Sequence, residues 1–182
     1  FPNINIFGYT LLPGTEFYER REEYRIEAIP VAGYGKAKGE YVVGCHSFSR
    51  EEGEEGYFLI SAHILLVHGH IMPLTTRLLA LKGEVPVSPL FRELLNDLIE
   101  AFASELPELD ASDRMAVYEA RDAIYLACAA NREKTYGVLA STLTRHHRAH
   151  DKDSAEVLMT LELDRALCPR TGMETTIERE FA

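Results

Sequence analysis

Two short histidine clusters are the residues of this chain whose spacing is best suited to chemistry. His63, His68 and His70 form one cluster, and His146 and His150 belong to the other. On one helix His63 and His70 would share a face, and His146 and His150, four apart, could chelate one metal ion. Neither cluster has a carboxylate in a Glu-x-x-His or His-Glu-x-x-His arrangement. His63, His70, His146 and His150 are therefore candidate metal ligands, and ordinary core or surface histidines are the alternative.

The three cysteines, Cys45, Cys128 and Cys168, are far apart and form no Cys-x-x-Cys pair. This spacing excludes a zinc ribbon, a thioredoxin site and a local iron–sulfur motif. It is typical of buried or unmodified thiols in a reducing compartment, so we expect a cytoplasmic protein. Cys45 and His46 are adjacent, but neighbours on a strand point to opposite faces and do not readily form a nucleophile–base pair. We therefore assign no catalytic residue.

The charge of the chain disfavours two classes of partner. Its 182 residues include 19 Lys and Arg against 29 Asp and Glu, a formal net charge of -10. No basic run replaces phosphate counterions, so we expect neither nucleic acid nor an anionic membrane surface as a partner. The longest apolar stretch, residues 57–72, is interrupted by histidines and is too polar to span a bilayer comfortably. A hydrophobic fraction of 46% fits one globular domain, or one domain with an appendage.

The first 48 residues alternate between extended and turn signals. Residues 3–12 (NINIFGYTLL) predict a strand, which Pro13 and Gly14 end. Thr15 is placed to cap a short helix over residues 16–23. Residues 24–31 and 40–47 are further extended segments, joined by a glycine loop at 33–39 that lacks phosphate-loop spacing.

From Ser49 onward the pattern becomes helical. Apolar residues at spacings of three and four predict amphipathic helices. Pro73 should kink or divide the first, and Ser88 followed by Pro89 marks a helix start. The predicted helices cover residues 51–82, 88–106, 110–131, 132–147 and 155–167, before a tail at 175–181 that is extended or disordered. We predict an α+β, mostly α fold: a small β-containing part (1–48) and a bundle of about five helices (49–182).

One segment of the N-terminal part resembles a known family. Residues 5–16 (NIFGYTLLPGTE), the following FYERREEY and residues 40–49 (EYVVGCHSFS) precede a long hydrophobic helix. This order resembles the end of the catalytic barrel in cobalamin-binding radical S-adenosylmethionine (radical SAM) enzymes, over roughly residues 3–80. The resemblance implies that residues 1–48 are the end of a barrel-like sheet. It also implies that Thr15 and Glu16 sit at the active-site end and could bind cofactor or substrate; capping of the next helix is the alternative.

The chain lacks the segments that carry out catalysis in that family. The cluster-binding Cys-x-x-x-Cys-x-x-Cys motif and the cobalamin-binding domain are both missing, and the first residue is Phe1. We therefore expect the C-terminal, noncatalytic portion of a longer radical SAM enzyme, acting as a substrate lid or interaction region with the remainder of that polypeptide as partner. The parent enzyme would use S-adenosylmethionine, a [4Fe–4S] iron–sulfur cluster and cobalamin on an unknown small-molecule substrate, and this chain alone would hold none of them. The alternatives are a freestanding helical binding or homo-oligomerisation module, and a histidine-ligated metal-binding protein.

Overall fold

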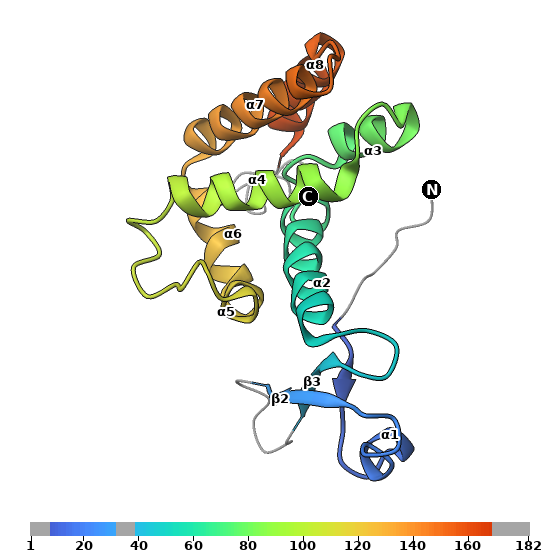
Figure 1. Cartoon of the computed structure of the whole chain (residues 1–182). Coiled ribbons are helices and arrows are strands. Elements are labelled where there is room, and N and C mark those ends of the chain that lie inside the picture. The colour runs from blue at the N-terminus through green and yellow to red at the C-terminus, as the bar shows by residue number, and fades with distance from the viewer. Residues whose placement is uncertain (1–7, 32–38, 169–182) are drawn as a thin grey trace, which may run out of the picture.

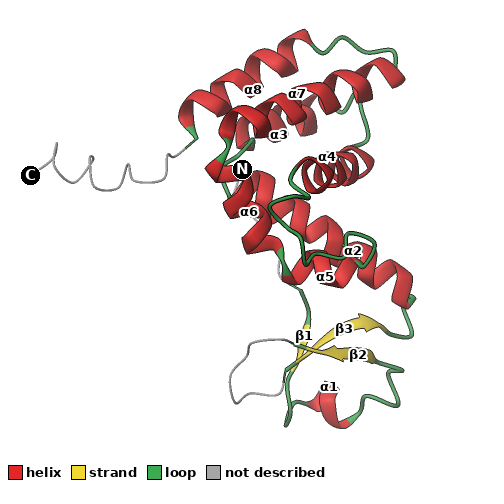
Figure 2. Cartoon of the chain, turned by 90° about the vertical axis from the view of Figure 1, so that its left-hand side faces the viewer, coloured by secondary structure: helices red, strands yellow, loops and turns green. Residues whose placement is uncertain are grey.

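A computed structural model describes residues 8–31 and 39–168 of the chain. The fold is α+β and mostly α, as predicted: a small antiparallel sheet precedes a larger set of helices (Figures 1 and 2). We call residues 8–31 and 39–48 the N-terminal lobe, and residues 49–168 the helical part. The predicted tail at 175–181, the start of the predicted first strand (3–7) and most of the glycine loop lie outside the described residues.

The sheet of the N-terminal lobe has three short strands, β1 (Thr10–Leu11), β2 (Glu27–Pro30) and β3 (Glu40–Gly44). Their order is β1-β3-β2, and both neighbouring pairs are antiparallel. Strands of an α/β barrel are parallel, so the described antiparallel sheet does not have the barrel arrangement that the resemblance implies. Within the described residues the predicted first strand is paired at Thr10–Leu11, and the chain then turns at Gly14, whose φ of 81° suits glycine.

Helix α1 (Glu16–Glu19) follows that turn and is shorter than the predicted 16–23. Side chains alternate along β3, so that Tyr41 and Val43 face one side of the sheet and Val42 the other. Tyr41 and Val43 pack against the helical part. The sheet therefore lies between α1 and the first long helix (Figure 2).

The first long helix, α2 (Arg50–His63), begins at a capping box. The Ser49 hydroxyl accepts from the Glu52 amide at 3.2 Å, and the Glu52 carboxylate accepts from the Ser49 amide at 2.8 Å. The helix runs on as a π-helical turn, η1 (Ile64–His68), and α3 (Pro73–Lys82) leaves it at 114°. The predicted division at Pro73 is confirmed.

No single helix in the described part of the chain is both long enough and apolar enough to cross a membrane. Residues 50–68 and α3 reach the required length and hydropathy only together, and they are bent by 114° relative to one another.

The remaining helices follow the predicted segments with changes at their bounds and one division. Helix α4 (Val87–Ala101) starts after Pro86 instead of Ser88, so Ser88 and Pro89 lie in its first turn, and it ends before the predicted bound of 106. The predicted helix at 110–131 is two helices, α5 (Arg114–Glu119) and α6 (Arg121–Ala130), which break at Ala120. The Asp113 carboxylate caps α5 by accepting from two backbone amides. Helices α7 (Arg132–Ala149) and α8 (Ala155–Leu167) complete the described chain.

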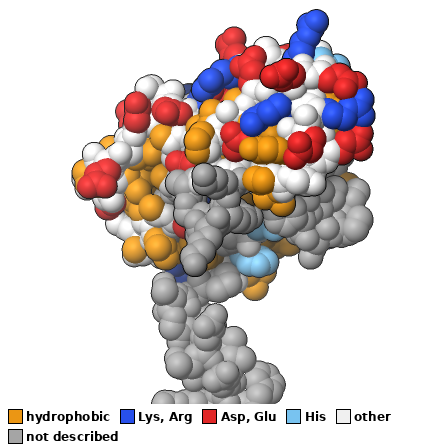
Figure 3. Space-filling model, turned by 90° about the horizontal axis from the view of Figure 1, so that it is seen from below, with side chains coloured by type: hydrophobic (Ala, Val, Ile, Leu, Met, Phe, Trp, Pro, Cys, Tyr) orange, Lys and Arg blue, Asp and Glu red, His pale blue; other side chains and the backbone are white. Residues whose placement is uncertain are grey.

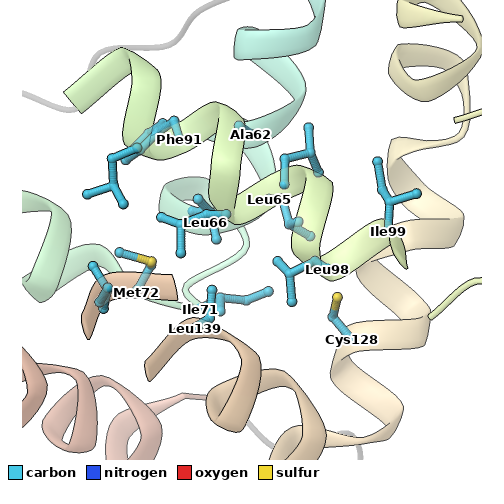
Figure 4. Close-up of a cluster of buried hydrophobic side chains, with 14 of the residues drawn as sticks. Ala62, Leu65, Leu66, Ile71, Met72, Phe91, Leu98, Ile99, Cys128 and Leu139 are labelled. Atoms are coloured by element: carbon cyan, nitrogen blue, oxygen red, sulfur yellow. The ribbon is translucent and has the colours of Figure 1, made fainter. Parts of the chain in front are cut away.

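One continuous apolar cluster forms the core of the helical part (Figure 4). It draws on α2, η1, α4, α6, α7 and α8, and Leu66, Leu98 and Leu139 in it are fully buried. Helix α8 adds a polar tie: the buried carboxylate of Asp164 accepts from the backbone amides of Leu74 and Thr75, at 2.9 and 2.8 Å. Asp164 thus caps α3 from another helix, because Met72 at the cap position offers no hydrogen-bonding side chain.

Candidate functional sites

A tyrosine cluster joins the N-terminal lobe to the helical part. The rings of Tyr41 (β3), Tyr57 (α2) and Tyr118 (α5) have centroids 4.8 to 5.5 Å apart, and all three side chains are buried. The Tyr57 hydroxyl donates to the Tyr9 carbonyl at 2.9 Å. Burial raises the pKa of the Tyr57 hydroxyl well above its ordinary value, so the phenol stays neutral. These contacts make the cluster a structural joint between the two regions.

A glycine allows the two regions to approach this closely. A Cβ atom on Gly53 of α2 would lie 1.9 Å from the backbone oxygen of Val43 in β3. No side chain fits at that distance without moving the backbone, so the first turns of α2 can cross the sheet only with glycine at this position.

The outer side of the lobe exposes a run of aromatic rings. Tyr9 contacts Phe17 edge-on at 6.1 Å between ring centroids, Phe17 contacts Tyr24 at 5.4 Å, and Tyr24 contacts His46 at 6.4 Å. Tyr9 and Phe17 each leave 49% of their surface exposed. We call Tyr9, Phe17 and Tyr24 the aromatic face. Sequence reasoning missed it, because Tyr9 belongs to the predicted strand and Phe17 follows the turn at Gly14, so no single helix or strand carries the whole face.

Charged side chains of both signs surround the lobe's apolar ones. Arg20 pairs with Glu16 and Glu23, both at 2.5 Å, and its guanidinium lies 5.0 Å from the centre of the Tyr24 ring. Seen from below, the molecule shows acidic and basic groups side by side, with apolar atoms between them (Figure 3). No single-sign surface dominates this view.

The turn that carries the predicted cofactor-binding residues has local partners for both of them. The Thr15 hydroxyl donates to the Leu12 carbonyl at 2.7 Å and accepts from the Tyr18 amide at 3.3 Å, capping α1. Glu16 pairs with Arg20 and is largely exposed. Both side chains stabilise the turn in this structure, and their binding of a cofactor stays a prediction.

The first histidine cluster is arranged differently from the expected helical spacing. His63 and His68 have ring centroids 5.1 Å apart; His63 directly precedes η1 and His68 is its last residue. The cause is the π-helical turn, which closes hydrogen bonds over five residues, as from the Gly69 amide to the Ile64 carbonyl at 2.8 Å. The helix ends before His70, whose φ is 56°. The expectation that His63 and His70 share one helical face was therefore wrong, and His68 is the neighbour of His63 instead.

The second cluster has the predicted neighbours. The rings of His146 and His150 at the C-terminal end of α7 have centroids 4.5 Å apart. His146 is only 2% exposed, and its Nδ1 lies 3.1 Å from the Glu93 carboxylate on α4. The Nδ1 of His150, at the same helix end, donates to the His146 carbonyl at 2.9 Å. Sequence spacing indicated the pair but not its contact with Glu93, 53 residues away.

Cysteines of this chain do not fit the ligand set of an iron–sulfur cluster. Cys45 follows β3, Cys128 lies in α6 and Cys168 follows α8, and the cluster-binding spacing is absent from the sequence. Burial raises the pKa of the Cys128 thiol to about 12, which keeps it protonated. More generally, the residues described here include no group of three or more His, Cys, Asp or Glu side chains that could hold a metal ion.

A polar hollow of about 320 Å³ lies at the turn between α7 and α8. Its lining residues are Thr144, Arg148, Asp151, Lys152, Asp153 and Ser154. Two basic and two acidic side chains balance in charge, so the hollow does not select a ligand by its net charge.

Comparison with known proteins gives no relative: no protein-family model matches the chain, and no curated protein matches it.

Proposed function

We propose that this chain is the noncatalytic C-terminal region of a cobalamin-dependent radical SAM enzyme, and that its N-terminal lobe docks against the remainder of that parent polypeptide. The resemblance of residues 3–80 to that family supports the identity of the parent. The exposed aromatic face of the lobe is the observation that carries the docking role.

Exposed aromatic side chains are costly to leave in water and effective in an interface. A buried aromatic ring contributes 150–250 Å² of contact, and aromatic residues are enriched among those that dominate binding energy. Tyr9 and Phe17 are each half exposed although they already contact one another, and Leu12 in the same turn is 42% exposed. The neighbouring ion pairs of Arg20 give this apolar surface a charged rim, as protein interfaces commonly have.

The sheet provides a second reason for a partner. Strands of two, four and five residues form a small sheet, and β1 and β2 are its edges. Natural proteins usually cover or shorten sheet edges, because exposed backbone donors and acceptors pair with other strands. A partner that packs on the aromatic face beside β1 would cover both features at once.

In this proposal the cofactor chemistry belongs to the parent polypeptide. S-adenosylmethionine, the [4Fe–4S] cluster and cobalamin would be held upstream, and this region would close over the substrate or hold the enzyme's parts together. Thr15 and Glu16 in the exposed turn would be the residues of the lobe nearest to that site.

The coding sequence upstream of Phe1 tests the parentage directly. We expect an open reading frame that encodes a Cys-x-x-x-Cys-x-x-Cys motif, preceded by a cobalamin-binding domain. A start codon immediately before Phe1, with no such motif upstream, would overturn the proposal.

A helical oligomerisation module is the second candidate, and one feature of α8 favours it. Met159, Leu163 and Leu167 are spaced by four residues and are 70%, 57% and 71% exposed, which forms an apolar stripe along one side of the helix. Such stripes are typical of helix-mediated association. Light scattering should then give the mass of a dimer for the wild-type chain and for Phe17→Ser. Leu163→Glu should give the mass of a monomer. A wild-type chain that is monomeric at all concentrations would contradict this function.

A further inference from the structure

The end of α7 holds two imidazoles in an arrangement suited to a shared ligand. His146 and His150 are one helical turn apart, and their ring centroids are 4.5 Å apart. A metal bonded about 2.0–2.1 Å from an imidazole nitrogen can reach two rings at this separation. The helix C-terminus also carries the negative end of the macrodipole, which favours a cation there.

Hydrogen bonds fix which nitrogen of each ring is available. An ionised carboxylate only accepts, so the Nδ1–H of His146 donates to Glu93. The Nδ1–H of His150 donates to the carbonyl of His146. In the neutral form of each ring Nε2 then bears the lone pair. Histidine ligands in metal sites are commonly oriented this way, by a carboxylate or a backbone carbonyl on the other nitrogen.

The Nε2 of His146 is the unexplained atom at this place. It is buried and has no hydrogen-bond partner among the residues that the structure describes. Buried polar atoms are rarely left unpaired, since each costs free energy. His150 is exposed, so an ion could enter from its side.

Charged neighbours favour a cation. Glu93 and Asp97 of α4 face this end of α7, and Arg145 lies 2.5 Å from Asp97 and 3.8 Å from Glu93. On the side that faces α4, two carboxylates stand against one guanidinium, so this side of the imidazole pair carries a net negative charge.

We propose that Nε2 of His146 and Nε2 of His150 bind one divalent transition-metal ion of the imidazole-preferring class, such as Zn²⁺, Cu²⁺ or Ni²⁺. Water completes the coordination, because no third His, Cys, Asp or Glu ligand groups with the pair among the described residues. Glu93 is a positioning residue that holds the tautomer and orientation of His146. This site does not depend on the radical SAM proposal.

Titration of the full chain with Zn²⁺ near pH 7.5, followed by calorimetry, tests the site. We expect one ion per chain, and no comparable binding of Mg²⁺, which prefers oxygen ligands. His150→Gln should weaken zinc binding at least tenfold, and Glu93→Gln should weaken it about tenfold through the orientation of His146. His150 is exposed, so its replacement should leave the circular dichroism spectrum unchanged.

Two matched controls make the result decisive. His63→Gln removes a histidine of the other cluster, and His46→Gln removes an exposed one in the lobe; both should keep the wild-type affinity. The proposal is overturned if the dissociation constant for zinc is above 100 µM, which corresponds to a binding free energy weaker than about 5.5 kcal/mol. It is equally overturned if His150→Gln binds like the wild type, or if His63→Gln causes the loss instead.

Discussion

The helical part buries most of its apolar side chains in one core, whereas the N-terminal lobe leaves much of its apolar surface exposed. In the helical part a continuous core runs from Phe58 to Leu161, and long helices cover it. In the lobe the sheet is thin, only Leu11, Val42 and Val43 are buried to 3% exposure or less among its apolar side chains, and its aromatic face is half exposed. The difference indicates that the helical part is stable on its own contacts, whereas the lobe depends on its neighbours.

The joint between them explains how the lobe is held. Tyr41 and Val43 pack on Tyr57 and Tyr118, and the Tyr57 hydroxyl bonds the backbone of Tyr9. These contacts lie on one side of the sheet only. The other side, with Tyr9 and Phe17, is therefore available to a second partner.

Shortening a core side chain should have the largest effect on the free energy of unfolding, and it tests which of the two regions supplies the stability. Leu98 is fully buried between helices. Leu98→Ala should lower the free energy of unfolding by about 3 kcal/mol, through lost burial and the cavity left behind. Urea denaturation followed by circular dichroism measures it. Phe17→Ala in the lobe is the matched control, and an equal loss in both variants would break the contrast.

The remote cap of α3 should have the next largest effect. Asp164→Ala removes the acceptor for the Leu74 and Thr75 amides and leaves the buried Thr75 amide without its partner, which should cost about 2–3 kcal/mol. Asp153→Ala removes an exposed carboxylate that accepts from Ala155, and should cost about 1 kcal/mol or less. The same urea experiment measures both, and equal costs would contradict the role of Asp164.

Removing the Tyr57 hydroxyl should weaken the joint between the two regions and leave the helical core folded. Tyr57→Phe removes the hydrogen bond to Tyr9 and should cost about 1 kcal/mol. Hydrogen exchange should then quicken in β1 and β3 but not in α4. Equal acceleration in α4 would show that the two regions do not unfold separately.

Alkaline pH should weaken the same joint. Burial holds the pKa of the folded Tyr57 above the value of about 10 of an unfolded tyrosine. The unfolded chain therefore loses this proton first, so the contribution of Tyr57 is complete below about pH 10 and declines above it. Urea denaturation at a series of pH values should show a smaller decline in Tyr57→Phe. An identical decline in both proteins would contradict this assignment.

Ser49→Ala should also have a small effect on stability. It removes one half of the capping box at the start of α2, next to the lobe, and should cost about 1 kcal/mol. Glu51→Gln, in the same turn but outside the box, should be close to neutral. Thermal unfolding compares the two, and a neutral Ser49→Ala would show that the cap is not needed.

Much of the helical part could be predicted from sequence because its signals are local. The spacing of Leu90, Leu94 and Leu98 predicts the buried face of α4, and Pro73 predicts the division after α2. The π-helical turn has no such signal, so the pairing of His63 with His68 was missed. The break at Ala120 also has no glycine or proline near it that would predict the end of a helix.

Contacts between distant residues could not be read from local pattern. Asp164 caps a helix 90 residues earlier, and Glu93 contacts His146 across 53 residues. In the lobe, the spacing of Tyr9 and Phe17 follows neither a helix nor a strand, since the turn at Gly14 brings them together. Candidate sites of this chain therefore depend on packing that only the fold reveals.

Hydrogen exchange of the proposed parent polypeptide, compared with that of this chain alone, tests the docking of the lobe most directly. We predict that amides of β1 and α1 exchange at least tenfold more slowly in the parent, that those of α4 exchange equally in both, and that Phe17→Ser in the parent reduces the protection of the lobe. If the amides of β1 and α1 exchange at the same rate in the parent and in the chain alone, the lobe is not a docking surface.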